Sequence, residues 1–415
     1  MHALGRGVRE ADELAAAGHG ERALTRRAEA IDMLRASGDP AASPVLVEAM
    51  FKQAGALARA GRTDDAVALL VELAEQYGDV AVPGKDIDVE FEALRTAAIS
   101  YSRAERYDHA VEIAEAMSNR TMGRPGRDAA AAWALVFKAR CLLTMGQTEK
   151  GLAILAEVID RFGESRDRGV ANLVATAMFN RAARLRDCGR HPDAVLGWRK
   201  TFDRFRREPP TDDPALPFRA LLAAVQILLI DGCLQDALET ARTLIACLEE
   251  DRSEDLIREI ARMAIRAGNT FHHHQAYEQA LEVYNDVESR LARASTDRLR
   301  ALAVSAHLHA GFTLARQGQI ASAISASKDV FRLGEPALIA LQEMADDASE
   351  EPSTHQRAAW ALLMRALLLG ELRREEEARA GFRHITEVFS NDDSPLVRAF
   401  VTVAREALAE FEGRR

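Results

Sequence analysis

Small and large apolar residues recur along this chain at helical spacing and, on a longer scale, about every 43 residues. The longer period is set by short turns, in which one turn residue, often Gly, is followed five positions later by a small residue. The turn residues are Gly18, Gly61, Glu105, Gly146, Gly189, Gly232, Gln275, Gly318 and Arg373. They are separated by 43, 44, 41, 43, 43, 43, 43 and 55 positions. This regularity indicates nine copies of one structural unit.

Two further sets of residues keep a fixed distance from these turns. Seven positions earlier stand Ala11, Ala54, Ala98, Ala139, Ala182, Val225, Gly268, Gly311 and Ala366, which are small apart from the valine. Four positions earlier stand the large apolar residues Leu14, Leu57, Tyr101, Leu142, Leu185, Leu228, Phe271, Leu314 and Leu369. Residues three positions apart share one face of a helix. Each unit is therefore predicted to be a helical hairpin whose first helix packs closely on its second.

These features resemble tetratricopeptide repeats, which share the small residue, the large residue three later, the Gly-type turn and the alanine early in the second helix. The units are longer than the ~34 residues usual for that family, and are similar to the lengthened repeats of kinesin light chains and many bacterial regulatory proteins. The resemblance implies an all-α fold, a right-handed α-solenoid of about nine hairpins over residues 4–390. It also implies one superhelical domain over residues 1–415.

The two ends and the ninth unit depart from the regular pattern. Gly5 and Gly7 predict a short or frayed opening helix. Ser394-Pro395 is typical of a helix start and predicts a capping helix over residues 394–412. The last step of 55 exceeds the usual 43, and the extra residues lie between positions 331 and 356. Apolar periodicity over 337–344, followed by acidic residues at 346–351, predicts an added short helix or a helix extension and then an exposed loop.

Charge and cysteine content narrow the function classes. The chain has 54 Lys and Arg against 64 Asp and Glu, net -10, with both signs interspersed, which gives no general case for nucleic-acid binding. The four cysteines are far apart and form no C-x-x-C pair, so we expect neither a zinc site nor a disulfide framework. The longest apolar stretch, 221–230, is too short to span a bilayer. These features predict a cytoplasmic protein without a membrane partner.

Two motifs suggest metal or nucleotide chemistry at first sight. His272, His273 and His274 are adjacent, but successive helical side chains point about 100° apart and cannot all share one ion. The stretch 78–85 resembles a phosphate-binding loop, yet Asp86 stands where a Ser or Thr that binds Mg²⁺ is required. We therefore expect no metal, no cofactor and no enzymatic activity.

Charge is distributed unevenly between the two helices of the hairpins. The 14 residues before the nine turn residues contain 16 Lys or Arg and 8 Asp or Glu, so the first helices are basic although the chain is acidic. In this type of solenoid the first helices line the concave groove. Arg262, Arg266 and Asn269 are spaced four and three apart on one polar face. Equivalent positions in other units hold Arg140, Asn180, Arg186, Arg219, Gln226 and His309.

A basic groove of this kind suits an acidic partner, because the arginine fork matches carboxylates and asparagine can bind a peptide backbone. The leading hypothesis is an adaptor or regulatory sensor that binds an acidic or extended segment of a protein partner. Three alternatives stay open. The arginines can instead pair with glutamates of neighbouring second helices. The array can be a structural scaffold subunit of a larger complex or a homo-oligomer. It can also be a regulator that responds to a signalling peptide and has no DNA-binding domain of its own.

Overall fold

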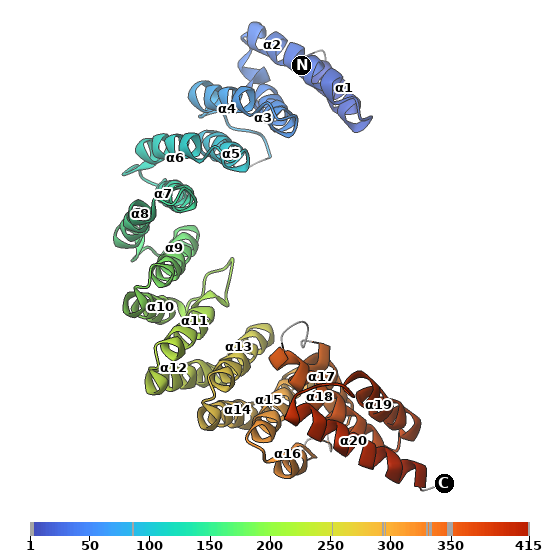
Figure 1. The fold of residues 1–415 in the computed structure, drawn as a ribbon. Coiled ribbons are helices and arrows are strands. Elements are labelled where there is room, and N and C mark those ends of the chain that lie inside the picture. Colours follow the sequence, from blue (N-terminus) through green and yellow to red (C-terminus); the bar gives the residue numbers. More distant parts are fainter. Residues whose placement is uncertain are drawn as a thin grey trace. The chain divides into compact units, whose positions relative to one another are not determined.

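The computed structural model describes residues 4–84, 87–250, 252–292, 294, 296–328, 331, 334–346 and 352–413. In these ranges the chain forms twenty α-helices and two short 3-10 helices, and no strand (Figure 1). The predicted all-α repeat fold is confirmed. Contacts between residues group the chain into two compact units. Unit 1 is Met1–Cys188 with Pro210–Asp212, and unit 2 is Gly189–Pro209 with Asp213–Arg415. The division falls at the turn of the fifth predicted hairpin.

Eighteen of the helices described lie at the positions predicted for the first and second helices of the hairpins. The first helices are α1 (Leu4–Ala16), α3 (Ser43–Arg59), α5 (Val89–Arg103), α7 (Asp128–Thr144), α9 (Arg168–Asp187), α11 (Leu216–Ile230), α13 (Glu254–His273), α15 (Asp297–Arg316) and α18 (Pro352–Glu371). The second helices are α2 (Gly20–Ser37), α4 (Thr63–Tyr77), α6 (Tyr107–Thr121), α8 (Thr148–Phe162), α10 (His191–Phe205), α12 (Leu234–Ala246), α14 (Tyr277–Leu291), α16 (Ile320–Ser327) and α19 (Glu375–Val388). The 3-10 helices are Pro40–Ala42 and Cys247–Glu249.

The turn residues share one backbone conformation. All nine lie in the left-handed region, with φ between 57° and 80°, and every second helix begins two residues later. Six of them are glycines, and the other three, Glu105, Gln275 and Arg373, are the non-glycine residues of the described chain with positive φ. At the turns other than Gly189, the next backbone N–H donates to the carbonyl oxygen of the large apolar residue five positions back, as from Cys233 to Leu228 at 2.7 Å. This bond closes the first helix and fixes where the second begins.

The small and large residues before the turns pack as the pattern predicts. All nine small residues are buried, and none of the nine large apolar residues is exposed. At Gly268 an added Cβ would lie 2.4 Å from the Tyr284 ring of α14, so the close approach of the two helices requires the glycine. At Gly7 an added Cβ would lie 3.0 Å from Cβ of Ala30. The opening helix α1 is thus formed over 13 residues and packs on α2, and the expectation of a short or frayed helix is wrong.

The extra chain in the ninth unit contains the predicted added helix, α17 (Glu335–Asp346). The acidic residues after Asp346 lie outside the described residues. The helix α20 (Pro395–Gly413) lies where the closing helix is predicted, and the hydroxyl of Ser394 accepts the Val397 N–H at 3.4 Å. Its Phe400 is fully buried and lies 5.4 Å from the Trp360 ring of α18. None of the described helices is both long and apolar enough to cross a bilayer.

The added helix changes the direction of the helix that follows it. The first helices α13 and α15 run parallel. At their starts, the hydroxyl of Thr296, just before α15, donates to the carboxylate of Glu254 in α13. Near the ends of the two helices, His272 of α13 is hydrogen-bonded to Thr313 of α15. The start of α18 instead lies at the end of α15, where Arg316 donates to Gln356 at 2.5 Å. One turn further along α18, the indole N–H of Trp360 donates to the Leu308 carbonyl oxygen at 3.3 Å. Therefore α18 runs antiparallel to α15, because one unpaired helix has been inserted between them.

The three non-glycine turn residues give a test of the left-handed turn. A residue with a Cβ in this conformation costs about 1 kcal/mol or more relative to glycine. Glu105→Gly, Gln275→Gly and Arg373→Gly should each raise the free energy of unfolding by about 0.5–1 kcal/mol, measured by denaturant titration.

Gly146→Ala is the matched control, because the added Cβ would have no heavy atom within 4 Å and only the backbone conformation changes. It should lower the free energy of unfolding by about 1 kcal/mol. A loss of stability in Glu105→Gly, as expected for glycine inside an ordinary helix, would contradict this account.

Candidate functional site

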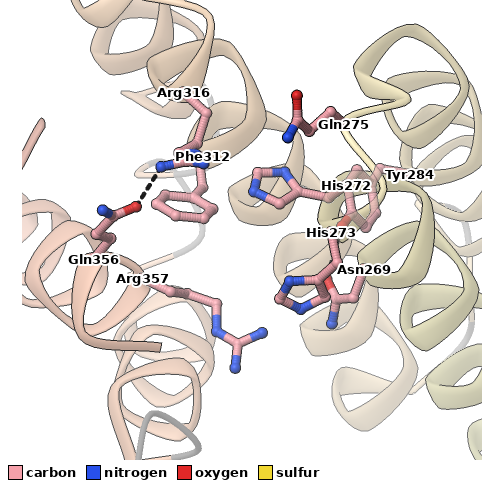
Figure 2. A pocket seen from close by; sticks show the side chains of 9 residues that line it. All are labelled: Asn269, His272, His273, Gln275, Tyr284, Phe312, Arg316, Gln356 and Arg357. Atoms are coloured by element: carbon pink, nitrogen blue, oxygen red, sulfur yellow. Dashed lines mark hydrogen bonds between the residues drawn. The ribbon is translucent and has the colours of Figure 1, made fainter. Parts of the chain in front are cut away.

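A polar pocket of about 150 Å³ lies in unit 2 where α13, α15 and α18 meet (Figure 2). Its lining residues are Asn269, His272 and His273 of α13, Gln275 of the following turn, Tyr284 of α14, Phe312 and Arg316 of α15, and Gln356 and Arg357 of α18. The parallel course of α13 and α15 brings their last turns together. The reversed course of α18 brings the side chains from near its start to the same place, so the pocket exists because of the inserted helix.

The tyrosine and the asparagine at the pocket are fixed by one hydrogen bond. Gly268 leaves room for the Tyr284 ring, which is 1% exposed, and its hydroxyl donates to Oδ1 of Asn269 at 2.7 Å. Because Oδ1 is the acceptor of this bond, the amide Nδ2 of Asn269 remains a hydrogen-bond donor at the pocket.

The tautomer of His272 follows from its neighbours. The Thr313 hydroxyl donates its single proton to the carbonyl oxygen of His309 at 2.9 Å. Its oxygen therefore accepts from Nδ1–H of His272, also at 2.9 Å. In the neutral ring this leaves Nε2 of His272 as an acceptor, and it has no hydrogen-bond partner among the described residues. The ring also stacks on Phe312, with centroids 5.1 Å apart.

Burial keeps the two inner imidazoles neutral. It lowers the pKa of His272 to about 3, and His273, Arg316, His309 and Arg357 add to this effect by charge. Burial likewise lowers the pKa of His309 to about 4; the Ser305 carbonyl opposes this and the charge of Arg357 adds to it. Burial also raises the pKa of the Tyr284 hydroxyl. All three groups are thus uncharged near neutral pH.

The charge of the pocket comes from two arginines. Arg316 donates to the Gln356 side chain, and no carboxylate is paired with it among the residues described. Arg357 has no hydrogen bond or ion pair within the described part of the chain, and its Nε is buried without a partner. The described lining residues include no Asp or Glu. The pocket therefore presents N–H donors and positive charge, which is an arrangement suited to an oxyanion.

The structure distributes the predicted site residues over both units. Arg140, Asn180 and Arg186 belong to unit 1, and Arg219, Gln226, Arg262, Arg266, Asn269 and His309 belong to unit 2. Several already have partners within the chain. Arg140 lies 4.6 Å over the Phe137 ring, Arg186 pairs with Asp187 at 2.7 Å, and Arg219 pairs with Asp213.

Of the predicted residues, Asn269 lines the pocket and His309 lies behind it. The two flank the Tyr284 ring, whose centroid is 5.6 Å from that of His309. His309 is only 8% exposed and donates Nδ1–H to the Ser305 carbonyl oxygen at 2.8 Å. The expectation that His309 meets a partner directly is therefore corrected, since its side chain lies beneath the surface.

Sequence reasoning missed most of the pocket. The sequence singles out His272 only as one of three adjacent histidines that cannot all share a metal ion, and does not indicate that its ring is 9% exposed and stacked. The pattern does not select Arg316, Gln356 or Arg357. In regular repeats the first helices run parallel, so residues at the end of one, such as Arg316, would lie far from residues near the start of the next, such as Gln356 and Arg357. The signal that could have found them is the 55-residue step, which indicates one extra helix and therefore a reversed direction of the first helix that follows it.

Some ion pairs between hairpins join two second helices. Arg35 of α2 pairs with Glu72 of α4 at 2.7 Å, and Arg242 of α12 pairs with Glu282 of α14 at 2.5 Å. Lys138 of α7, which pairs with Glu115 of α6 at 3.2 Å, is an example of the alternative in which first-helix cations meet second-helix glutamates. On α13 the pair is within the helix, from Arg262 to Glu259 at 2.9 Å, and both side chains are about half exposed.

Comparison with known proteins supports the repeat assignment. Residues 48–79, which span most of α3, the turn at Gly61 and α4, match the tetratricopeptide repeat family. The predicted recognition of tetratricopeptide repeats is thereby confirmed, while the lengthened subtype stays a prediction. No curated protein matches the sequence.

Solved structures of helical repeat proteins are similar to this chain at low sequence identity. A tetratricopeptide repeat protein from Parabacteroides merdae is 11% identical, with a TM-score of 0.33, over 76% of this chain and 98% of its own. The apo form of RapI is 13% identical, with a TM-score of 0.42, over 89% and 99%. A Rap protein complexed with competence and sporulation factor is 14% identical, with a TM-score of 0.33, over 99% of both chains. At these values the likeness extends to neither partner nor mechanism.

The buried imidazoles predict a pH dependence of stability. Their pKa values are lower in the folded chain than in the unfolded chain, so below about pH 6.5 the unfolded chain binds more protons. Each histidine should cost at most about 1.4 kcal/mol of unfolding free energy per pH unit as the pH falls from about 6.5 toward its folded pKa.

The measurement is denaturant unfolding at about pH 7 and about pH 5, on the wild type and on His272→Asn/His309→Asn. Asparagine keeps an N–H donor but does not titrate. The double variant should lose less stability between the two pH values than the wild type. Equal losses would mean that these imidazoles titrate normally.

Proposed function

We propose that this chain, an all-α array of helical hairpins with a tetratricopeptide repeat at residues 48–79, binds an extended, acidic segment of a protein partner along α13 and into the pocket at its end. Its role is binding rather than catalysis. The reducing cytoplasm is the proposed location, which fits four cysteines that are all free thiols, two of them exposed.

The observation that carries the proposal is a row of side chains on α13. Arg262, Arg266, Asn269 and His273 follow one another at steps of four, three and four, which places them on one helical face. Both arginines are exposed, and Arg266 has no ion pair among the described residues. The last two members line the pocket. The row is about 16 Å long, which matches about five residues of extended chain.

The energetics favour a bound segment over an internal use of these arginines. The pair between Arg262 and Glu259 joins two half-exposed side chains, and such surface pairs contribute only about 0–1 kcal/mol. A partner carboxylate that covers Arg262 and Arg266 would remove water from both and strengthen the attraction. Two alternatives remain. In a structural scaffold subunit no peptide segment would lie along this row, and in a regulator without a DNA-binding domain a signalling peptide would bind there.

The test is a double charge reversal, Arg262→Glu/Arg266→Glu, in the full chain. Proteins captured from a native lysate by the wild type and by the variant are identified by mass spectrometry. The variant should lose the partner while helicity and melting stay nearly unchanged, because both side chains point to solvent. Added salt should weaken wild-type capture, since screening at about 0.15 M acts over ~8 Å.

The matched control is Arg398→Glu/Arg405→Glu on α20, which reverses two exposed arginines of another helix. This variant has the same net charge and should retain the partner. If the α13 variant folds and still captures the partner at wild-type strength, the row is not the binding site. Equal loss in both variants would indicate a general charge effect.

A further inference from the structure

We infer that the pocket between α13, α15 and α18 is a binding site for a phosphoryl group, presented as a phosphoserine or phosphothreonine side chain of the partner segment. The inference rests on the proposed function, because the segment laid along α13 would deliver the group to the pocket. It goes further in assigning the chemistry of the group that the pocket accepts.

The first argument is charge. Arg316 and Arg357 both line the pocket, and among the described residues no Asp or Glu lines it and no carboxylate pairs with either arginine. The imidazoles of His272 and His309 are neutral, and the two guanidinium groups supply the permanent positive charge of the described lining. A phosphate monoester carries a charge of about −1.5 to −2 near pH 7, which balances two guanidinium groups, whereas a carboxylate balances one.

The second argument is direction. The donors come from three different helices: the Asn269 amide from α13, Arg316 from α15 and Arg357 from α18 (Figure 2). A carboxylate has two oxygens in one plane and is satisfied by a single guanidinium fork. A phosphate monoester has three terminal oxygens in a tetrahedral arrangement, and each can accept from a different wall of the pocket.

The third argument is the buried donor of Arg357. Its Nε is covered and has no partner, although the guanidinium is held at the pocket wall. The side chain as a whole is half-buried, and no described acceptor or carboxylate occupies its guanidinium, so its donors are available to a ligand. The volume of about 150 Å³ admits a side-chain head group and excludes a folded segment.

Isothermal titration calorimetry at low ionic strength tests the inference with three defined probes and the full chain. The probes are the capped tripeptide Ala-phosphoserine-Ala, the same peptide with Asp at its centre, and inorganic phosphate. The phosphopeptide should bind about tenfold or more tightly than the Asp peptide, and inorganic phosphate should compete with it. Equal binding of the two peptides would overturn the phosphoryl assignment and leave the proposed function standing.

Variants of the pocket locate the bound group. Arg316→Gln and Arg357→Gln should each weaken phosphopeptide binding about tenfold or more. The controls are Arg298→Gln, about 27 Å away along α15, and Arg365→Gln, two turns further along α18. Both should bind as the wild type does. Unchanged binding in Arg357→Gln would overturn the inference.

Asn269→Asp keeps the test informative if an arginine variant does not fold. The substitution preserves size and the acceptor for the Tyr284 hydroxyl, but replaces a donor by a negative charge. Phosphopeptide binding should be lost. The tripeptide is too short to reach Arg262, so Arg262→Glu/Arg266→Glu should bind it nearly normally. A binding defect in the row of side chains on α13 can thereby be told apart from a binding defect in the pocket.

Discussion

The structure depends on one backbone constraint, the left-handed residue at each hairpin turn. It ends the first helix, and the N–H that follows it returns to the carbonyl of the large apolar residue, as from Arg374 to Leu369 at 2.9 Å. Because the second helix then begins two residues later, the small residues of both helices meet at a fixed level. Ala366 and Ala378 of the ninth unit are both buried in this way. Close packing in each hairpin is thus a consequence of the turn.

The pocket arises where this repetition is interrupted. As long as hairpins follow one another directly, first helices run parallel and their ends carry similar side chains. One inserted helix, α17, makes α18 run against α15 and brings Arg357 to the wall that already holds Arg316. Two like charges are thereby held beside one cavity, and none of its described lining residues is acidic. Such an arrangement is unfavourable in the empty state and favourable when an anion is bound.

Much of the fold could be predicted from the sequence because it depends on local rules. The turn period located Gly146 and even the non-glycine Gln275, and the 55-residue step located α17. Packing at Gly7 was misjudged, because helix propensity predicts fraying and cannot show that Ala30 fills the space. The site was predicted less well. Asn269 was found from its helical face, whereas Arg357 joins it through a helix direction that no local pattern encodes.

The same limit applies to His272. The sequence shows it only as one of three adjacent histidines, and the packing of α15 places its ring against Phe312 and Thr313. Burial then removes its charge, so a residue that reads as a candidate metal ligand or cation becomes a neutral acceptor. Tertiary context, and not residue type, decides its role.

The central claim is that α18 runs antiparallel to α15, and cross-linking tests it most directly. In a background with the exposed Cys188 and Cys233 replaced by Ser, two cysteine pairs are compared with a short bismaleimide: Arg316→Cys with Gln356→Cys, and Arg316→Cys with Glu371→Cys. The account predicts an intramolecular cross-link in the first pair and none in the second, since Glu371 ends α18 far from Arg316. Cross-linking of the second pair alone would contradict the reversal and the pocket that it builds.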